Sequence, residues 1–502
     1  MAMLLLALLL LLLPVVFLVV IARERSMFSK LNLPPGPAML PVVGNLHQVG
    51  GLPHRRLREL SRRHGPVMLL RLGRVRTVVV SSAEAAKAVM KTQDVECCSR
   101  PASPGPKRLS YDLKNLGFAP YGDYWREMRK LFMVELLSMR RVKAAAYARE
   151  QQVAKLVSNL SRLAGQPVAL NDHIFGLTDG IIGTVAFGNV YGADQFPHKG
   201  RFQEVLDEAM EMMASFSAED FFPGAGGRLV DRLTGLFGRR ERVFKELDAF
   251  FEVIIEQHLA EPARHNGGDL VDVLIGLWKE QHGTLSFTKD HVKAIILDTF
   301  IGAIDTSSVT MLWAMSELIR KPRLLSKLQD EIRATVGSNH LGRVQEHHVP
   351  SLTYLKMVVK ETLRLHPPAT LLVPRETMQP VQIGGYDVPA KTRILVNAWA
   401  IGRDPASWTS NSEDFNPARF QGSDIDFNGA HFQFLPFGAG RRICPGLAMG
   451  VMNVEFTLAN LLYCFDWALP DGMTPENVSM EEAGALIFHR KTPLVLVPTP
   501  QG

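Results

Sequence analysis

The ten residues FGAGRRICPG, at 437–446, constrain this chain more than any other stretch. Cys444 lies among three glycines, and Arg442 stands two residues before it. Glycine permits tight turns and a close approach of the backbone to a flat ligand, and a cysteine thiolate is a strong metal ligand. The residues that follow, LAMGVMNVEFTLANLLY, predict a helix, whose N-terminal end favours a negatively charged sulfur. A lone cysteine in such a loop is more often structural, so other parts of the chain have to show whether Cys444 is a metal ligand.

The amino terminus, residues 1–22, is an uncharged apolar run, long enough to cross a bilayer core of about 30 Å as a helix. Arg23, Arg25 and Lys30 follow it, which by the positive-inside tendency keeps the C-terminal side in the cytosol. A cleaved signal peptide is the alternative, but the length of the run and the absence of an Ala-x-Ala site favour an anchor. We expect a transmembrane signal anchor over 1–22.

Composition limits the remaining possibilities. A length of 502 residues suggests about three domains, but no linker follows residue 40. We therefore expect a basic and proline-rich hinge over 23–40 and a single domain over 41–502. The four cysteines have neither zinc-site spacing nor a disulfide framework, which suits a body that faces the cytosol. With a net charge of only +6 and no basic run with interleaved aromatic residues, the chain is not expected to bind nucleic acid.

Helical periodicity dominates the rest of the chain. Alternating apolar segments between 41 and 82 predict a small β-rich lobe. Residues 101–120 are rich in turn formers and predict a long loop, and PATLLVPRET predicts an extended strand. Residues 140–280 predict amphipathic helices with a break at 221–227. We therefore expect a mainly α-helical protein with a small β lobe.

Residues 289–320 contain no proline and predict one helix, about 48 Å long. Thr288 is a plausible N-cap, and Pro322 ends the helix. In its middle, IGAIDTSS interrupts an otherwise apolar pattern, and hydroxyl groups there permit local distortion of the helix. Taken alone, the pair Asp305 and Thr306 is most often a satisfied core contact.

Two further pairs share a helical face. Trp125 and Arg129 are four residues apart in YGDYWREMRKLFMVELL, and Glu361 and Arg364 are three apart in KMVVKETLRLHPP. Each pair is a weak signal by itself: the first is typical of a surface arginine over a half-buried tryptophan.

The order and spacing of these motifs resemble the cytochrome P450 family, and within it the plant microsomal A-type group. The resemblance covers essentially residues 1–500. It implies the P450 fold, a b-type haem, and Cys444 as the axial ligand of the haem iron. The sequence departs from the family at Gly302-Ala303, where Ala/Gly-Gly is usual. The added methyl group is expected to narrow the oxygen groove or to press on the substrate.

The resemblance also implies roles for other residues. Trp125 and Arg129 match a W-x-x-x-R motif that hydrogen-bonds a haem propionate, and Arg375 supplies another propionate contact. Glu361 and Arg364, with Arg419, form a buried network that holds the Cys444 loop. Thr306 is expected to hold a water molecule, and Asp305 to draw protons from solvent. The other residues implied for the haem are Phe437, Gly440, Arg442 and Gly446, and those implied for the substrate pocket are Tyr111, Phe118, Ala303, Ala369, Ala485 and Leu486.

The implied chemistry is that of a monooxygenase dependent on NADPH and O2, because a thiolate-ligated haem favours O–O bond cleavage. No nicotinamide or flavin fingerprint occurs in the chain, so we expect electrons from an NADPH–cytochrome P450 reductase that docks on the Cys444 side. The other expected partners are a small aromatic substrate, dioxygen and membrane lipid. The expected location is the endoplasmic reticulum membrane, with one span and a cytosolic catalytic domain.

Several stretches resemble plant enzymes of cyanogenic-glucoside formation, among them CCSRPASPGPKRLSYDLKN and HPPATLLVPRET. These enzymes convert an aromatic aldoxime such as 4-hydroxyphenylacetaldehyde oxime through the nitrile to a cyanohydrin. The alternatives are a P450 hydroxylase of another small phenolic, terpenoid or indole metabolite, a haem-thiolate isomerase or dehydratase, and a non-catalytic haem-binding protein. The intact Asp305-Thr306 pair argues against an isomerase that uses no dioxygen.

Overall fold

A computed structural model describes residues 31–188, 199–260, 268–281, 286–337, 342–409 and 411–501. The anchor predicted over 1–22 and the first part of the hinge lie outside these described residues.

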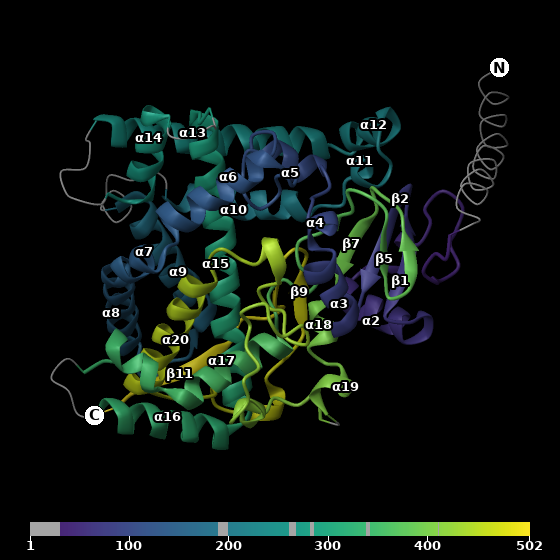
Figure 1. The fold of residues 1–502 in the computed structure, drawn as a ribbon. Coiled ribbons are helices and arrows are strands. Elements are labelled where there is room, and N and C mark those ends of the chain that lie inside the picture. The colour runs from purple at the N-terminus through teal and green to yellow at the C-terminus, as the bar shows by residue number, and fades with distance from the viewer. Residues whose placement is uncertain are drawn as a thin grey trace.

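Helix α15, Lys289–Arg320, runs through the centre of the molecule (Figure 1). Its bounds are those predicted, because no proline interrupts it and Pro322 begins the next helix. It packs against α9, Leu170–Phe187, and α20, Leu447–Cys464, within the main hydrophobic core. Both α15 and α20 are long and apolar enough to cross a membrane, but 56% and 61% of their most apolar windows are buried inside the protein. Burial against other helices therefore accounts for their apolar character.

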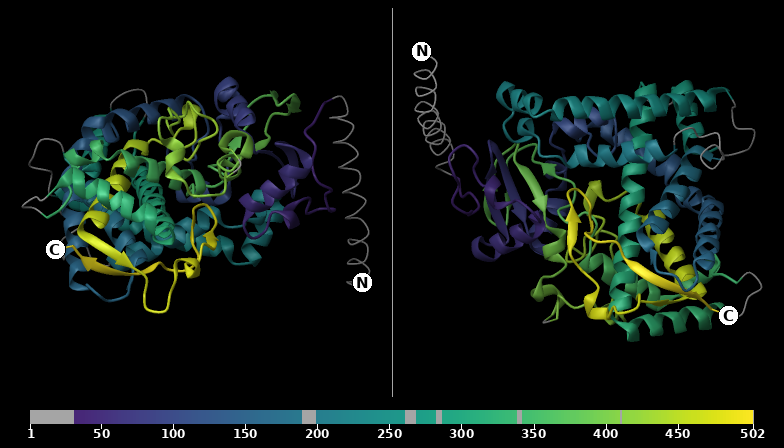
Figure 2. Two further views of the ribbon diagram at one scale, coloured as in Figure 1. Left: turned by 90° about the horizontal axis from the view of Figure 1, so that it is seen from below. Right: turned by 180° about the vertical axis from the view of Figure 1, so that it is seen from behind.

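The other helices are arranged around α15 and along the edge of the β lobe (Figure 2). The longer ones are α2 Pro53–His64, α6 Asp123–Leu131, α8 Ala146–Arg162, α10 Lys199–Ala214, α12 Ala225–Leu233, α13 Leu236–Ala260, α14 Leu270–Glu280, α16 Pro322–Val336 and α17 Thr353–Leu365. The short ones are α3 Ala83–Lys87, α4 Asp94–Cys97, α5 Pro104–Leu109, α7 Met139–Ala144, α11 Ala218–Phe221, α18 Ala398–Ile401 and α19 Pro405–Trp408. Short 3₁₀ helices are η1 Leu46–Gln48, η5 Glu346–Ser351, η6 Pro417–Phe420, η7 Gly440–Arg442 and η8 Pro475–Asn477, and the π-helical turns are η2 Ala88–Thr92 and η3 Phe132–Leu136.

The expected β lobe is a four-stranded sheet of order β1-β2-β7-β4, which lies to one side of the helices (Figure 1). Strands β1 and β2 form an antiparallel hairpin, and β2 pairs in parallel with β7, so the lobe joins segments about 300 residues apart. Its strands are β1 Val67–Leu72, β2 Val75–Val80, β4 Arg375–Glu376 and β7 Arg393–Val396. Smaller sheets are β3-β11-β8 (Val168–Ala169, Val495–Pro500, Phe465–Ala468), β5-β6 (Val381–Ile383, Tyr386–Val388) and β9-β10 (Glu482–Gly484, Phe488–Arg490).

Three local predictions differ from the structure. The loop predicted over 101–120 contains α5, which begins at Pro104, because a proline is well tolerated in the first turn of a helix. The strand predicted for PATLLVPRET is limited to Arg375–Glu376, since a turn at 369–372 precedes it. The helix break predicted at 221–227 is shorter, because α12 already begins at Ala225.

Candidate active site

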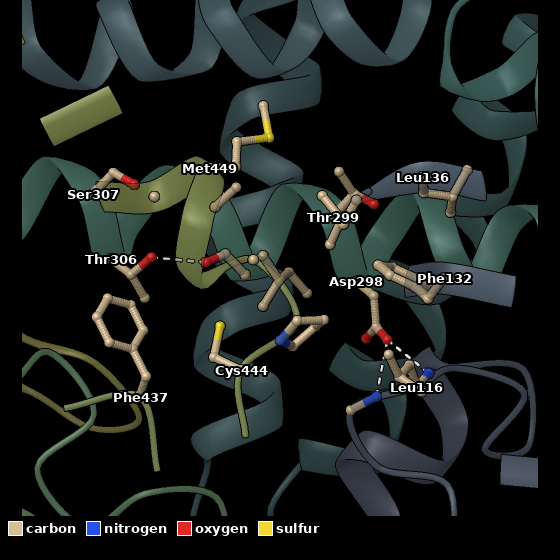
Figure 3. Close-up of a pocket in the computed structure, with 18 of the residues that line it drawn as sticks. Leu116, Phe132, Leu136, Asp298, Thr299, Thr306, Ser307, Phe437, Cys444 and Met449 are labelled. Atoms are coloured by element: carbon tan, nitrogen blue, oxygen red, sulfur yellow. Dashed lines mark hydrogen bonds between the residues drawn. The ribbon is translucent and has the colours of Figure 1, made fainter. Parts of the chain in front are cut away.

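Cys444 lies on a tight loop between η7 and α20 and lines a cavity of about 430 Å³, within the usual range of ligand pockets (Figure 3). Its amide donates to the Phe437 carbonyl over 3.0 Å, which closes the loop. Gly440 has a φ of +69°, and a Cβ there would lie 2.2 Å from the Met90 carbonyl oxygen. No other residue fits that position without a shift of the backbone. The loop therefore needs a glycine at position 440.

The Cys444 sulfur is enclosed by protein, and burial raises the pKa of its thiol. The Gly446 N–H and the Arg129 guanidinium oppose that effect and lower the pKa. A bound metal cation would lower it further, because the thiolate is the form that ligates metals. Cys444 lines the cavity, as a metal ligand must, whereas Cys97 and Cys464 do not line it, and burial raises their pKa values to about 12 and about 11.

Of the five described arginines that line the cavity, four influence one another electrostatically and form what we call the arginine wall, namely Arg100, Arg129, Arg375 and Arg442. Arg442 donates to the carbonyls of residues 98, 116 and 119 over 2.7–3.3 Å, and burial lowers its pKa to about 9. Arg100 donates to the carbonyls of residues 117, 373 and 374 over 2.6–3.0 Å. Burial lowers the pKa of Arg100, and the nearby Arg442 and Arg375 lower it further.

The charge of this arginine group is only partly balanced. Arg375 pairs with Asp94 over 3.0 Å, and no hydrogen bond to Arg129 occurs among the residues that the structure describes. Four buried or half-buried guanidinium groups therefore share one hydrogen-bonded carboxylate in the described part of the chain. Burying that much positive charge is unfavourable unless anions balance it. The site fits a ligand with two carboxylates beside its metal, as in haem b with its two propionates.

Asp94 was not predicted from the sequence, yet it connects Arg375 to the loop that carries Cys444. One carboxylate oxygen accepts from Arg375, and the other accepts from the backbone and the side chain of Arg441 over 2.9 and 3.1 Å. Arg375 also donates to the Ala439 carbonyl over 2.8 Å. The loop that carries Cys444 is thus fixed to α4 and to β4.

Trp125 lies at the same wall, but its bonding differs from the prediction. Its indole N–H donates to the Leu116 carbonyl over 3.1 Å and does not point to a free position in the cavity. The Arg442 guanidinium stacks on its ring, 4.1 Å from the centroid. In this structure Trp125 therefore positions Arg442, while Arg129, four residues along α6, lines the cavity and has no hydrogen-bond partner in the described part of the chain.

The predicted network of Glu361, Arg364 and Arg419 is assembled behind the loop. Glu361 accepts two hydrogen bonds from Arg364, at 2.6 and 2.7 Å, and one from Arg419 at 3.2 Å. Arg364 also donates to the carbonyls of residues 402, 412 and 414, which precede the Cys444 loop in the chain. Such a bidentate network, in which Glu361 and Arg364 are fully buried, fixes geometry more than it adds stability.

Helix α15 presents Thr306 to the cavity, and the Thr306 hydroxyl donates to the Gly302 carbonyl over 2.7 Å (Figure 3). Asp305 lies on another side of the helix and does not line the cavity. Burial, and to a smaller extent Asp207 on α10, raise the pKa of Asp305 to about 6, and His489 on β10 opposes the shift. The acid and the hydroxyl are thus adjacent in the sequence, but they face different surroundings.

Four of the predicted pocket residues line the cavity, namely Phe118, Ala303, Ala369 and Leu486. Leu486 lies at the tip of the β9-β10 hairpin, which the bond from the Phe488 amide to the Pro368 carbonyl holds in place. The structure does not place Ala485 or Tyr111 at the cavity. Tyr111 has a φ of +54°, and its hydroxyl donates to Asp248 over 2.9 Å, which directs the ring toward α13.

Asp298 is a further cavity residue that the sequence analysis missed. Its carboxylate accepts from the Leu116 and Gly117 amides over 2.8 and 3.0 Å and from the Asn115 side chain over 2.6 Å. Burial raises its pKa, which these three donors oppose. Its position could have been inferred from the sequence, because residue 298 is eight positions before Thr306. Residues 298, 302, 306 and 310 are spaced by four and share one side of a helix.

Comparison with known proteins agrees with this geometry. The family model for cytochrome P450 matches residues 34–497. The chain is 70% identical to the 4-hydroxyphenylacetaldehyde oxime monooxygenase of Sorghum bicolor, over 95% of this chain and 91% of that protein. It is 49% identical to the 2-methylbutanal oxime monooxygenase of Manihot esculenta, over 93% and 91%. A zebra fish cytochrome P450 solved with progesterone has a similar fold, with a TM-score of 0.76 at 24% identity, over 90% of this chain and all of that one.

Proposed function

Because the chain belongs to the cytochrome P450 family of haem b monooxygenases, we propose that it converts 4-hydroxyphenylacetaldehyde oxime through the nitrile to a cyanohydrin. The observation that carries the proposal is the 70% identity, over 95% of the chain, to a monooxygenase named for that oxime. A second relative, 49% identical, is named for another aldoxime and supports the same substrate class. The general activity needs dioxygen and electrons from a reductase, for which we propose the NADPH–cytochrome P450 reductase of the same membrane.

The residues that would hold the haem are those of the Cys444 loop and the arginine wall. Cys444 would ligate the iron, with Phe437 and Gly446 beside it in the cavity wall. Gly440 lets the loop approach η2 closely. Arg129, Arg375 and Arg442, with Arg100, would balance the two propionates. When bound, a thiolate-ligated haem supplies the activation of dioxygen.

The first proposed step removes water from the aldoxime. The C–H bond of the CH=N group and the N–O bond break, and a carbon–nitrogen triple bond forms without net oxidation. The protein contributes an apolar wall of Phe118, Ala303, Ala369 and Leu486, which can hold an aryl ring and exclude solvent. Binding in one orientation lowers the entropic part of the barrier.

The second proposed step places a hydroxyl group on the carbon next to the nitrile. One atom of O2 enters the C–H bond and the other leaves as water, with two electrons and two protons supplied from outside. Thr306 would hold a water molecule in the cavity and pass a proton through its hydroxyl. Asp305, whose pKa is raised to about 6, can exchange protons near neutral pH.

We also propose that residues 1–22 anchor the protein in the endoplasmic reticulum membrane, that 23–40 form the hinge and that 41–502 form the cytosolic domain. The apolar run and the basic residues after it support this arrangement. Membrane fractionation of the full chain and of a form that lacks 1–22 tests it. Both forms in the soluble fraction would contradict the anchor.

The function is tested with the full chain and a plant reductase in membranes that are fed 4-hydroxyphenylacetaldehyde oxime. Mass spectrometry should find the nitrile and then the cyanohydrin or the aldehyde to which it decomposes, with consumption of NADPH and O2. Hydroxylation of other phenolics, terpenoids or indoles without either product would overturn the substrate. Nitrile formation without O2 consumption would instead indicate a dehydratase, and a haem protein that consumes no NADPH would indicate a non-catalytic role.

A further inference from the structure

The cavity face of α15 carries polar groups at regular intervals. Asp298, Gly302, Thr306 and Thr310 all line the cavity and are four residues apart, so they lie along one side of the helix. Asp298 and Thr306 are separated by two turns, about 12 Å along the axis. Figure 3 shows both side chains on this helix, with the cavity beside them. Asp298 thus begins this row, two turns before the Thr306 hydroxyl that we assign to proton delivery.

The Asp298 carboxylate has capacity for one more hydrogen bond. Its Oδ2 accepts from the Leu116 and Gly117 amides, and among the described residues its Oδ1 accepts only from the Asn115 side chain. An ionised carboxylate offers about four lone-pair sites, so one site on Oδ1 remains. Asp298 is half-buried and lines the cavity, so the accessible part of its side chain faces the cavity.

The two other carboxylates at the cavity are less suitable acceptors. Asp269 lies at the start of α14, where it accepts from the Asp272 amide and is paired with His258 over 3.0 Å. Glu135 is on η3, outside α15. Neither is aligned with Thr306 on the same helix. Thr299, next to Asp298, already donates its hydroxyl proton to the Ile295 carbonyl over 2.9 Å.

We propose that Asp298 is the specificity-determining acceptor for the para-hydroxyl group of the aryl aldoxime. The inference rests on the proposed function, because it assumes that the substrate is such an oxime. By ordinary bond lengths an extended 4-hydroxyphenylacetaldehyde oxime spans about 8–9 Å between its two oxygens. One hydrogen bond of about 2.7 Å brings that to the two-turn spacing of Asp298 and Thr306. The ring then lies along α15, over Gly302 and Ala303.

A carboxylate at this position discriminates by chemistry. It accepts an O–H in a short, charge-assisted bond, but it gains nothing from an aryl hydrogen or a methoxy group. Because a hydrogen bond to a charged group is among the stronger ones, we expect the hydroxylated oxime to be favoured about 10- to 100-fold. The three protein donors stay bonded to Asp298 when the substrate carries no hydroxyl group. The preference is therefore smaller than in a site whose polar group would be left without any partner.

The test compares three oximes on the full-length, haem-loaded protein with reductase in vesicles. They are 4-hydroxyphenylacetaldehyde oxime, its 4-methoxy analogue and phenylacetaldehyde oxime. The dissociation constant of each is measured by equilibrium dialysis, and kcat/KM is measured by product formation. In Asp298→Asn the side-chain oxygen can still accept the hydrogen bonds from the Leu116 and Gly117 amides. The side-chain nitrogen, which only donates, then replaces the acceptor oxygen that faces the cavity. We expect the preference for the hydroxylated oxime to fall to less than about threefold, in both binding and kcat/KM.

Asn115→Ala is the matched control, because it loosens the same loop and leaves the carboxylate in place. It should change the constants of the three oximes by equal factors. Equal losses for all three in Asp298→Asn, or an unchanged preference, would overturn the inference and leave Asp298 a loop anchor only. If the wild type still converts the oximes when either of these results is found, the proposed function is not contradicted. No nitrile from any oxime in the wild type would overturn both.

Discussion

Asp94→Asn should destabilise the protein by about 3 kcal/mol, although Asp94 lies outside the cavity lining. The Asp94 and Arg375 side chains are both only 4% exposed, and they pair over 3.0 Å. Removing one member of a buried pair leaves a buried charge without its partner, which typically costs about 3–5 kcal/mol. Arg441, the second partner, is 47% exposed, so its share is at most about 1 kcal/mol. The low end of the range applies because the amide oxygen of asparagine still accepts one bond.

The assay is urea unfolding of the haem-loaded protein, followed together with the carbon monoxide difference spectrum. A loss of about 3 kcal/mol lowers the folding equilibrium constant about 150-fold, and the loosened loop should reduce the thiolate-type absorbance. Glu96→Gln is the control, because it makes the same change of charge on the same short helix, α4, at a half-buried side chain. If Asp94→Asn unfolds within about 0.5 kcal/mol of the Glu96→Gln variant and keeps its spectrum, the assigned role of Asp94 is refuted.

Cys444→Ser should abolish the thiolate-type carbon monoxide spectrum, whereas serine at each of the other cysteines should preserve it (Cys97, Cys98 and Cys464). Thr306→Ala should bind haem and substrate but release reducing equivalents as peroxide and accumulate arylacetonitrile, and unchanged coupling of NADPH to product would contradict the role. Asp305 has a folded pKa of about 6, above its ordinary 3.8, so the folded state binds more protons and stability falls as pH rises from about 4 to 6. Asp305→Asn should therefore be more stable than the wild type at pH 7.5, by up to about 3 kcal/mol, and equally stable below pH 4. A difference in unfolding free energy that stays constant across this pH range would contradict the prediction.

The sequence predicted best those features that depend on neighbouring residues. The bounds of α15 followed from the absence of proline between Thr288 and Pro322, and the helix after Cys444 followed from its apolar pattern. The pairing of Glu361 with Arg364 needed only helical spacing. In each case the interacting residues are within a few positions of each other, where local geometry decides the contact.

The contacts that complete the site could not be predicted in this way. Asp94 is 281 residues from Arg375 and 347 from Arg441, and no local pattern relates them. Arg100 and Arg442 bond mainly to backbone carbonyls, which every residue carries, so their partners leave no trace in the sequence. Tyr111 was misplaced for a related reason: its left-handed backbone directs the ring to Asp248, and side-chain type does not show that conformation.

The middle of α15 gives up stability at two positions, three residues apart, and packing explains neither. A glycine inside a helix costs up to about 1 kcal/mol relative to alanine, yet a Cβ at Gly302 would meet nothing within 4 Å. No protein atom requires a glycine there, and Gly302 is exposed in the centre of the molecule because the cavity lies over it. Asp305 forms no salt bridge with another described residue, and its raised pKa is the second cost. Local sequence choices that lower stability are expected where a site has been selected for function. The space over Gly302 lies between Asp298 and Thr306, where we place the aryl ring. Of the two positions that weaken the helix, Gly302 therefore leaves space for the substrate, and Asp305 exchanges the protons that the reaction needs.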